Sequence, residues 1–471
     1  MTQQATTPTL AQRFAEYATA LRFEDLPAPV VHEAKRRVID SFGCALGAYD
    51  AEPCVVARDV AGGFSATRGA LLWGTRHVAP PDWAAFANGC LVRYLDYNDT
   101  YLSKEPAHPS DNIPAAFAAA QAHGAGGADL IVAIVLAYEV QCRLCDATSI
   151  RAIGWDHVTY GAFSSALAAA RLMKIGSERT RHAVNIAGVT SAALRQSRVG
   201  ELSHWKGCAF ANAARHGVYA ALLAGRGMTG PSPIFEGEKG FQKLVSGPLP
   251  IAGPFAQDST ARGASRVPAD GFMITRTSIK CWPVEYHAQS AVEASLALRP
   301  KIKGVADIES VLVESHDAAV DIIGSEPEKW RPASRETADH SLPYIVAAAL
   351  ADGEVTQQTF APERFTDAAL LELVGRVEVR RHEELSGLYP HTIGNIVTVR
   401  VRGGQTLTRR VDHACGYVRN PMSDAQVQDK FHRQADPVLG RRRAEALLGW
   451  CWGLEKAANL DAFADLMEVR R

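Results

Sequence analysis

The chain has 471 residues, 47% of them hydrophobic and 21% charged, so it is long enough to bury a large core and to form two domains. Its 50 lysines and arginines nearly balance its 51 aspartates and glutamates, and no block of like charges interrupts the sequence. This balance gives no reason to expect binding to nucleic acid or to an anionic membrane. An anionic ligand would need a local cluster of cations.

The N-terminal residues 1–20 lack a basic flank followed by an apolar segment, and the longest apolar run, Leu130–Tyr138, is about half a membrane span. We interpret the chain as a soluble cytoplasmic protein. Nine scattered cysteines include one CxxC pair, Cys142 and Cys145, with no second pair to complete a zinc site. That pair is interpreted as two buried small residues, and no metal or cofactor is expected.

Up to about Gly225 the pattern is helical, because apolar residues recur at intervals of three and four and alanine is frequent. The predicted helices cover Val30–Gly47, Pro114–His123, Asp129–Asp146, Gly161–Met173, Arg179–Leu194 and Cys208–Ala224. Gly225–Gly230, GRGMTG, satisfies the dinucleotide pattern GxGxxG, but it follows a helix instead of a strand, which favours a helix cap and a turn. The stretch Gly225–Gly271 is rich in glycine and proline and predicts an irregular connection at a domain boundary.

Strand patterns appear only beyond this connection. They cover Ser310–Ser315, Arg376–Arg381 and two runs joined by Gly403-Gly404, which is a strong hairpin signal. Helical patterns accompany them at Glu285–Leu298 and Pro343–Ala351, and helical character returns in Arg442–Ala457. The sequence therefore predicts a mainly α fold with an α+β domain. A large all-helical domain is built from both chain ends (residues 1–265 and 412–471), and an α+β lid (residues 266–411) is inserted.

Several short polar stretches interrupt the apolar pattern. The longest is LDYNDTYLSKEPAHPSDN, from Leu95 to Asn112. The others contain His157, then Arg195, Arg198, His204 and Lys206, then Lys280 and His287, and finally His340 and Tyr344. Each residue alone has an ordinary structural explanation, such as a helix cap or a satisfied core histidine. Together they supply cations and imidazoles suited to binding a polyanionic small molecule and moving protons on it.

The stretch LDYNDTYLSKEPAHPSDNIPA, together with HWKG, GMTGPSPIFEGEKGF, IKCWPVEYHAQSAVEA and DHSLPY, closely resembles the superfamily of 2-methylcitrate dehydratase and cis-aconitate decarboxylase, called MmgE/PrpD. The resemblance runs through nearly the whole chain. It implies an all-helical domain with an inserted α+β lid, a homodimer, and a metal-independent site between the domains. Asn98 and the long run before His108 are similar to the dehydratase branch, whereas decarboxylases tend to show D-F-D-D-T and a shorter run.

The resemblance also assigns site residues. The family's active-site aspartate and threonine match Asp96 and Thr100, its histidines match His108 and His157, and its tyrosine matches Tyr344, while its two lysines match Lys206 and Lys280. We expect the histidines to transfer protons, in an order left open, and the lysines to bind substrate carboxylates, with Arg195 and Arg198 as weaker clamps. Asp96 and Thr100 are expected to orient a histidine or the substrate hydroxyl, with capping of the turn as the alternative role of Asp96. Tyr344 is expected to close the pocket from the lid and donate a hydrogen bond.

These assignments predict a hydro-lyase that converts 2-methylcitrate to 2-methyl-cis-aconitate, with citrate as a further candidate substrate. Abstraction of a proton beside a carboxylate builds up negative charge, which fixed cations stabilise. Within the superfamily, the alternatives are decarboxylation of cis-aconitate and isomerisation or epimerisation of a related acid. From another class, the alternative is a non-catalytic helical protein that binds a metabolite.

Overall fold

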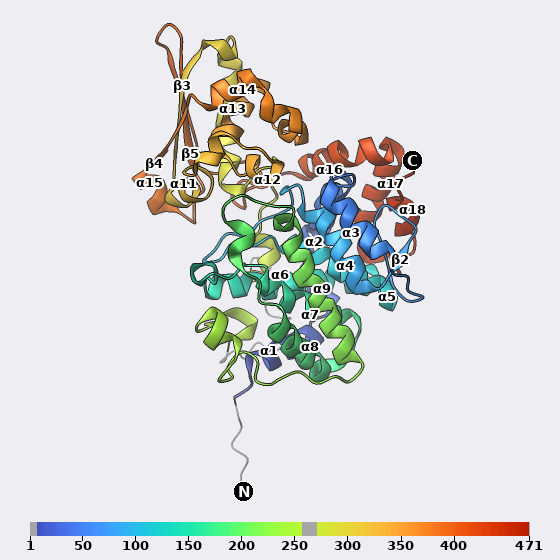
Figure 1. The fold of residues 1–471 in the computed structure, drawn as a ribbon. Coiled ribbons are helices and arrows are strands. Elements are labelled where there is room, and N and C mark those ends of the chain that lie inside the picture. Colours follow the sequence, from blue (N-terminus) through green and yellow to red (C-terminus); the bar gives the residue numbers. More distant parts are fainter. Residues whose placement is uncertain (1–6, 257–270, 471) are drawn as a thin grey trace.

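The computed structural model describes residues 7–256 and 271–470, which form two bodies of different architecture (Figure 1). The larger body, the helical domain, takes its helices from both ends of the chain. They are α1 (Leu10–Ala20), α2 (Ala28–Gly47), α3 (Glu52–Gly62), α4 (Pro81–Arg93), α5 (Ile113–His123), α6 (Gly127–Ala147), α7 (Thr159–Leu172), α8 (Gly176–Thr190), α9 (Trp205–Gly225), α16 (Asp424–Leu439), α17 (Arg441–Trp452) and α18 (Phe463–Met467).

Small residues let these helices approach closely. A Cβ atom on Gly217 of α9 would lie 2.6 Å from the carbonyl oxygen of Ala162 on α7, and one on Gly89 of α4 would lie 2.8 Å from the Ala211 side chain. Such spacing leaves no room for a larger residue, so the alanine and glycine content follows from helix packing. The helix ends are also encoded locally, because Thr9 and Gln12 form a capping box at the start of α1.

The smaller body, the lid domain, has its own hydrophobic core, formed by residues between Val284 and Val411. Its four-stranded sheet has the order β4 (Val377–Arg381), β3 (Ile308–Ser315), β5 (Asn395–Val401) and β6 (Thr406–Val411); β3 and β4 are parallel and the other pairs antiparallel. Along β5, residues 395, 397, 399 and 401 are buried. This face packs against α10 (Gln289–Leu298) and, near β4, against α13 (Leu342–Asp352). Shorter helices complete the domain, namely α11 (Asp317–Ile323), α12 (Arg335–Ala338), α14 (Ala368–Val374) and α15 (Glu383–Leu388).

The predicted fold class, mainly α with an α+β domain, is confirmed. The hairpin at Gly403-Gly404 is also confirmed, with φ values of 94° and 85°, and GRGMTG is the turn that ends α9. Three helices are shorter than predicted: α8 ends at Thr190, α10 begins at Gln289 after a single 3-10 turn, and α17 ends at Trp452 instead of Ala457. The predicted boundary at residues 265 and 266 lies outside the described residues.

The chain crosses between the two domains twice, through residues 277–283 and residues 412–423. The returning segment leads into α16, which packs along α2 of the helical domain. Lys430 of α16 forms a buried ion pair with Asp40 of α2 at 2.6 Å. The two chain ends are therefore joined in one core, as expected for a domain built around an insertion. In residues 7–256 and 271–470, no helix is both long enough and apolar enough to span a membrane.

Gly127 in the N-terminal half packs against Leu454 in the C-terminal segment, and this close contact leads to a stability prediction. A Cβ atom on Gly127, at the start of α6, would lie 1.7 Å from the carbonyl oxygen of Leu454. We expect Gly127→Ala to lower the free energy of unfolding by about 1–3 kcal/mol, because backbone must move to admit the methyl group. Thermal and denaturant unfolding would measure the change. The control is Gly62→Ala, whose methyl group would meet no atom within 4 Å; equal effects of the two substitutions would contradict the prediction.

Candidate active site

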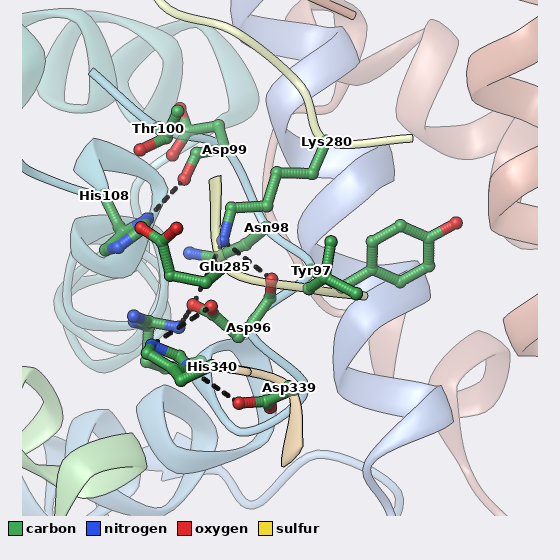
Figure 2. Close-up of polar contacts among 12 residues, drawn as sticks. Asp96, Tyr97, Asn98, Asp99, Thr100, His108, Lys280, Glu285, Asp339 and His340 are labelled. Carbon is green, nitrogen blue, oxygen red and sulfur yellow. Dashed lines mark hydrogen bonds and ion pairs between the residues drawn. The ribbon is translucent and has the colours of Figure 1, made fainter. Parts of the chain in front are cut away.

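The loop between α4 and α5, residues 94–112, carries most of the polar residues that the sequence singles out. At its start Asp96 has a φ of 51°, in the left-handed region that residues other than glycine seldom adopt. Its backbone amide donates a hydrogen bond to the carbonyl of Arg93 as the chain leaves α4. The resulting turn aims the Asp96 carboxylate at Lys280 and His340, which come from distant parts of the sequence (Figure 2).

Asp96 is the centre of a buried group of charges, here called the Asp96 cluster. Lys280 Nζ lies 3.1 Å from one carboxylate oxygen and donates to the Asp96 backbone carbonyl at 2.8 Å. Lys206 Nζ and His340 Nε2 each lie 3.8 Å from the other oxygen, and the Arg93 guanidinium bonds the carboxylate directly. The cluster therefore joins the end of α4, the start of α9, the first interdomain crossing and the lid domain.

Burial and mutual charge shift the pKa values in this cluster. Burial by itself would raise the pKa of Asp96, but Arg93, Lys206 and Lys280 outweigh it and hold that pKa well below its usual range. Burial lowers the pKa of Lys280 and lowers that of Lys206 to about 8. Near neutral pH Lys206 thus remains mainly charged. Both lysines are poorly solvated, which strengthens the attraction of a buried ammonium to any carboxylate that reaches it.

His340 and Asp339 form the part of the cluster that belongs to the lid domain. His340 Nδ1 bonds the Asp339 carboxylate, and Lys206 Nζ lies 3.4 Å from the same nitrogen (Figure 2). Burial and the charge of Lys206 lower the pKa of His340. In the stretch DHSLPY, the residue in contact with Asp96 is thus the histidine, to which sequence analysis assigned no role.

His108 lies on the same loop as Asp96, and a backbone carbonyl of that loop fixes the orientation of its ring. Its Nδ1 lies 2.7 Å from the carbonyl oxygen of Asp99, and since a carbonyl can only accept, Nδ1 carries the proton and the neutral ring has its lone pair on Nε2. The Asp99 carboxylate in turn accepts from Ser110 N and the Tyr138 hydroxyl, at 2.9 and 2.6 Å. Burial, followed by the charges of Arg93 and Lys280, lowers the pKa of His108 well below 6.5.

His157 lies beside His108, with 6.0 Å between the ring centroids. Its Nδ1 lies 2.9 Å from the Asp156 carboxylate, whose other oxygen accepts from Arg198 Nε at 2.9 Å. Its Nε2 is buried and has no hydrogen-bond partner among residues 7–256 and 271–470. Arg198 therefore contacts the carboxylate that orients His157, and an imidazole nitrogen is left for a further partner.

A third imidazole with this arrangement comes from the lid domain. His287 Nδ1 lies 2.8 Å from Glu285 Oε1, and the His287 backbone amide donates to Glu285 Oε2 at 2.7 Å. Burial opposes ionisation of Glu285, but His287 lowers the pKa of this carboxyl to about 2. His287 Nε2 is buried without a partner in the described part of the chain. The spacing Glu-x-His in the sequence could have indicated the Glu285–His287 pair. The three-residue spacing of Arg93 and Asp96 could likewise have indicated their ion pair.

Asp111 is a further titratable group that sequence analysis did not select. It follows His108 by three residues and accepts from Asn98 Nδ2 at 2.7 Å. Burial is the main cause that raises the pKa of Asp111 to about 7, while Arg93, whose Nε lies 3.7 Å away, opposes the shift. Such a carboxyl can exchange a proton near neutral pH.

Three of the predicted site residues belong neither to the Asp96 cluster nor to the groups around His108 and His157. Thr100 is buried, and its hydroxyl donates to the Ala107 carbonyl at 3.2 Å, which braces the loop. The Arg195 guanidinium is half-buried and makes no hydrogen bond or ion pair within the described residues. Tyr344 is fully buried in the lid core, where its hydroxyl donates to Thr359 at 2.8 Å. The expected pocket-closing role of Tyr344 is therefore corrected, because the lid core encloses its ring and its hydroxyl is already bonded.

Metal ligation has no obvious place in this arrangement. Over residues 7–256 and 271–470, no group of three or more histidine, cysteine, aspartate or glutamate side chains could hold a metal ion. The carboxylates near the imidazoles are instead engaged with arginines, lysines or the imidazoles themselves. The arrangement is suited to proton transfer and to binding an anion.

Comparison with known proteins gives consistent relationships over most of the chain. The model of the MmgE/PrpD N-terminal domain matches residues 12–252, and that of the C-terminal domain matches residues 282–454. A 2-methylcitrate dehydratase of Cupriavidus necator is 28% identical over 430 residues, covering 86% of this chain and 85% of the relative. One from Escherichia coli O157:H7 is 30% identical, covering 84% and 83%. The human cis-aconitate decarboxylase is 24% identical, covering 98% and 94%.

The Asp96 cluster makes a prediction about stability and pH. Asp96→Asn leaves Arg93, Lys206 and Lys280 buried without their shared counter-charge, and we expect it to cost about 3–5 kcal/mol of unfolding free energy at pH 7. Because the folded-state pKa of Lys206 lies below its unfolded value of about 10.4, stability rises with pH in the window between these values. The variant should therefore recover stability between about pH 8 and 10 as its lysines lose their protons. Chemical denaturation over this pH range measures both effects.

The control for this prediction is the double variant Asp96→Asn/Lys280→Met. Lys280 is the closer of the two lysines to Asp96 and therefore loses the most when the carboxylate is removed. Replacing this uncompensated cation by methionine should restore part of the lost stability. A single variant as stable as the parent protein, or a double variant less stable than the single one, would contradict a central electrostatic role for Asp96.

Proposed function

The chain belongs to the MmgE/PrpD family, and from this premise we propose that it is a lyase, specifically a hydro-lyase that removes water from 2-methylcitrate to give 2-methyl-cis-aconitate. Citrate is a second candidate substrate. The proposal is supported by the names of the bacterial relatives and by the dehydratase-like sequence around Asn98 and His108. The observation that carries it is the Asp96 cluster, in which two buried lysines contact a carboxylate on the same loop as the neutral, oriented His108.

The reaction needs a base, an acid and fixed positive charge. Abstracting a proton from carbon next to a carboxylate places negative charge on that carboxylate, which Lys206 and Lys280 stabilise electrostatically. His108 is the proposed base, because its lowered pKa keeps it neutral at pH 7 and its Nε2 carries the lone pair. His157 is the proposed acid, because the Asp156 carboxylate holds its Nδ1 and its Nε2 has no partner within the described residues; from Nε2 it protonates the departing hydroxyl, which leaves as water.

The remaining residues support these steps. Arg198 holds Asp156, and Asp99 holds His108, so both act on the orientation of an imidazole. His287 brings a third imidazole from the lid domain, where it can contact the substrate when the domains are closed. The Arg195 guanidinium has no hydrogen bond or ion pair to any residue that the structure describes and is proposed as an outer contact for a substrate carboxylate.

The proposed base leads to a kinetic prediction. His108→Gln retains hydrogen bonding but cannot shuttle a proton, so we expect turnover to fall by about 10²–10⁴-fold with a far smaller change in substrate affinity. Steady-state kinetics with 2-methylcitrate, together with a calorimetric binding measurement, would separate the two effects. The control is His123→Gln, the same substitution at an exposed histidine that ends α5, which should retain activity. Normal turnover in His108→Gln would exclude His108 as the base.

Lys280 provides a second kinetic test. Loss of a charged contact to substrate costs about 1.5–3 kcal/mol, and more where the charge acts mainly in the transition state. We therefore expect Lys280→Ala to remain folded and to lose activity. Near-normal turnover and affinity in this variant would remove Lys280 from the site.

We propose a metal-independent mechanism, since no ligand set of three or more side chains occurs within the described residues. Activity should survive prolonged chelation and exposure to air. Activity lost on chelation and restored by a divalent metal would refute this mechanism.

Decarboxylation is the second candidate reaction, favoured by the similarity to the human cis-aconitate decarboxylase. It would use the same cations and imidazoles, but the bond broken would be the C–C bond to a carboxylate instead of the C–O bond to a hydroxyl. Incubation with 2-methylcitrate, citrate and cis-aconitate, followed by assays of water loss and of released carbon dioxide, distinguishes the two. Tight binding of these acids without turnover would instead favour the non-catalytic alternative, and conversion without loss of either small molecule would favour an isomerase or epimerase.

We further propose a cytoplasmic homodimer. Its nine cysteines are all unpaired, which favours a reducing compartment. The end of α8, the segment after it and α9 expose large apolar side chains around one groove of about 500 Å³, and Leu194 and Trp205 are 67% and 48% exposed. A second copy would cover them. Trp205→Glu should shift the sedimentation coefficient from dimer to monomer, and a parent protein that sediments as a monomer would overturn this proposal.

A further inference from the structure

The two chain segments that connect the domains are packed against each other. Residues 277–283 lead into the lid domain, and residues 412–423 lead out of it. Val418 N donates to Ser278 Oγ at 3.0 Å. Gly416, with a φ of 88°, approaches so closely that a Cβ atom there would lie 1.9 Å from the carbonyl oxygen of Ile279. The backbones of the two connections are thus in direct contact.

Each connection carries one cysteine near this contact. Cys281 follows Lys280 directly, and Cys415 precedes Gly416. Helix α10 holds both from the same side: Gln289 accepts from Cys281 N at 3.2 Å, and Glu293, one turn later, accepts from Cys415 N at 2.7 Å. The two thiols lie within hydrogen-bonding contact of each other. The sulfur atoms of two separate connections are therefore neighbours.

This pair is also the accessible one. Cys281 and Cys415 are partly exposed, whereas the other seven cysteines are buried. The hydrogen bond from Cys281 lowers the pKa of the Cys415 thiol, which favours its thiolate, the form that reacts with oxidants. Cys90 and Cys208 provide an internal comparison, because they are also hydrogen-bonded to each other but both are buried within the helical domain.

We propose that Cys281 and Cys415 are a redox-sensitive pair that a peroxide converts to a disulfide, which clips the two interdomain connections together. The Cys415 thiolate attacks hydrogen peroxide, breaks its O–O bond and becomes a sulfenic acid; the hydroxide released takes up a proton and leaves as water. The Cys281 thiol then attacks that sulfur, and the sulfenic hydroxyl leaves with the thiol proton as a second water. Two thiols and one peroxide thus give one disulfide and two waters.

The disulfide would act on the hinge between the domains. The clip restricts the relative movement of the two connections and fixes the backbone beside Lys280, whose Nζ contacts Asp96. Where substrate entry and product release require the domains to separate, this restriction lowers turnover. This effect on turnover rests on the proposed function, whereas formation of the disulfide does not.

The chemical step is tested on the full chain. The reduced protein is treated with hydrogen peroxide, alkylated and digested, and the cysteine-containing peptides are identified by mass spectrometry. We expect a peptide pair linked through Cys281 and Cys415, reversed by dithiothreitol, while Cys90 and Cys208 remain alkylatable after unfolding. Cys415→Ser should yield no linked peptide. Free Cys281 and Cys415 after treatment, or disulfides that join other cysteines with equal yield, would overturn the proposal.

The effect on the hinge is tested by hydrogen exchange and by turnover. In the oxidised protein, backbone amides of residues 277–283 and 412–423 should exchange more slowly, and dithiothreitol should restore the original rate. Turnover should be lost on oxidation in the parent protein and retained in Cys415→Ser. Unchanged exchange in the crosslinked protein would overturn the hinge effect. If the reduced protein has no activity on any tested acid, the proposed function fails, while the crosslink and exchange results still decide the redox proposal.

Discussion

One buried carboxylate, that of Asp96, allows three cations and one imidazole from four parts of the chain to lie in a single cluster. Without it, Arg93, Lys206 and Lys280 would repel one another in a site removed from water, and the cost of burying them would be several kcal/mol for each ion. Arg93 ends α4, Lys206 begins α9 and Lys280 lies on the first interdomain crossing, while His340 reaches the same carboxylate from the lid domain. The relative position of the two domains thus depends on this charge.

The same cluster explains why the site is suited to anionic substrates. Cations that are already desolvated and oriented need little reorganisation when negative charge develops nearby, which is the main source of electrostatic catalysis. The neighbouring imidazoles share one design: Nδ1 is held by a carbonyl or a carboxylate in His108, His157 and His287. This leaves Nε2 to exchange protons.

The site is divided between the domains, so its geometry depends on the two connections between them. His108 and His157 belong to the helical domain, whereas His287 and His340 belong to the lid domain. The first connection carries Lys280, and the second packs against it at Gly416. A change at this contact is therefore transmitted to a residue of the Asp96 cluster through one peptide bond, which links the redox chemistry of Cys281 to the site.

The sequence by itself determined the fold class, nine of the 18 α-helices and four of the six strands in the described residues, and the loop from Leu95 to Asn112, because these follow from local periodicity, turn chemistry and motif resemblance. It also selected His108, His157, Lys206 and Lys280, of which the two lysines contact Asp96 and the two histidines are neighbours; their roles stay predictions. Only the tertiary structure placed His340 against Asp96 and enclosed Tyr344 in the lid core, although both lie in DHSLPY. Whether His340 or Tyr344 faces the other domain depends on packing between segments that are far apart in the sequence. The partners of Asp96 and the lowered pKa of His108 come from burial and neighbouring charge, which no local pattern encodes.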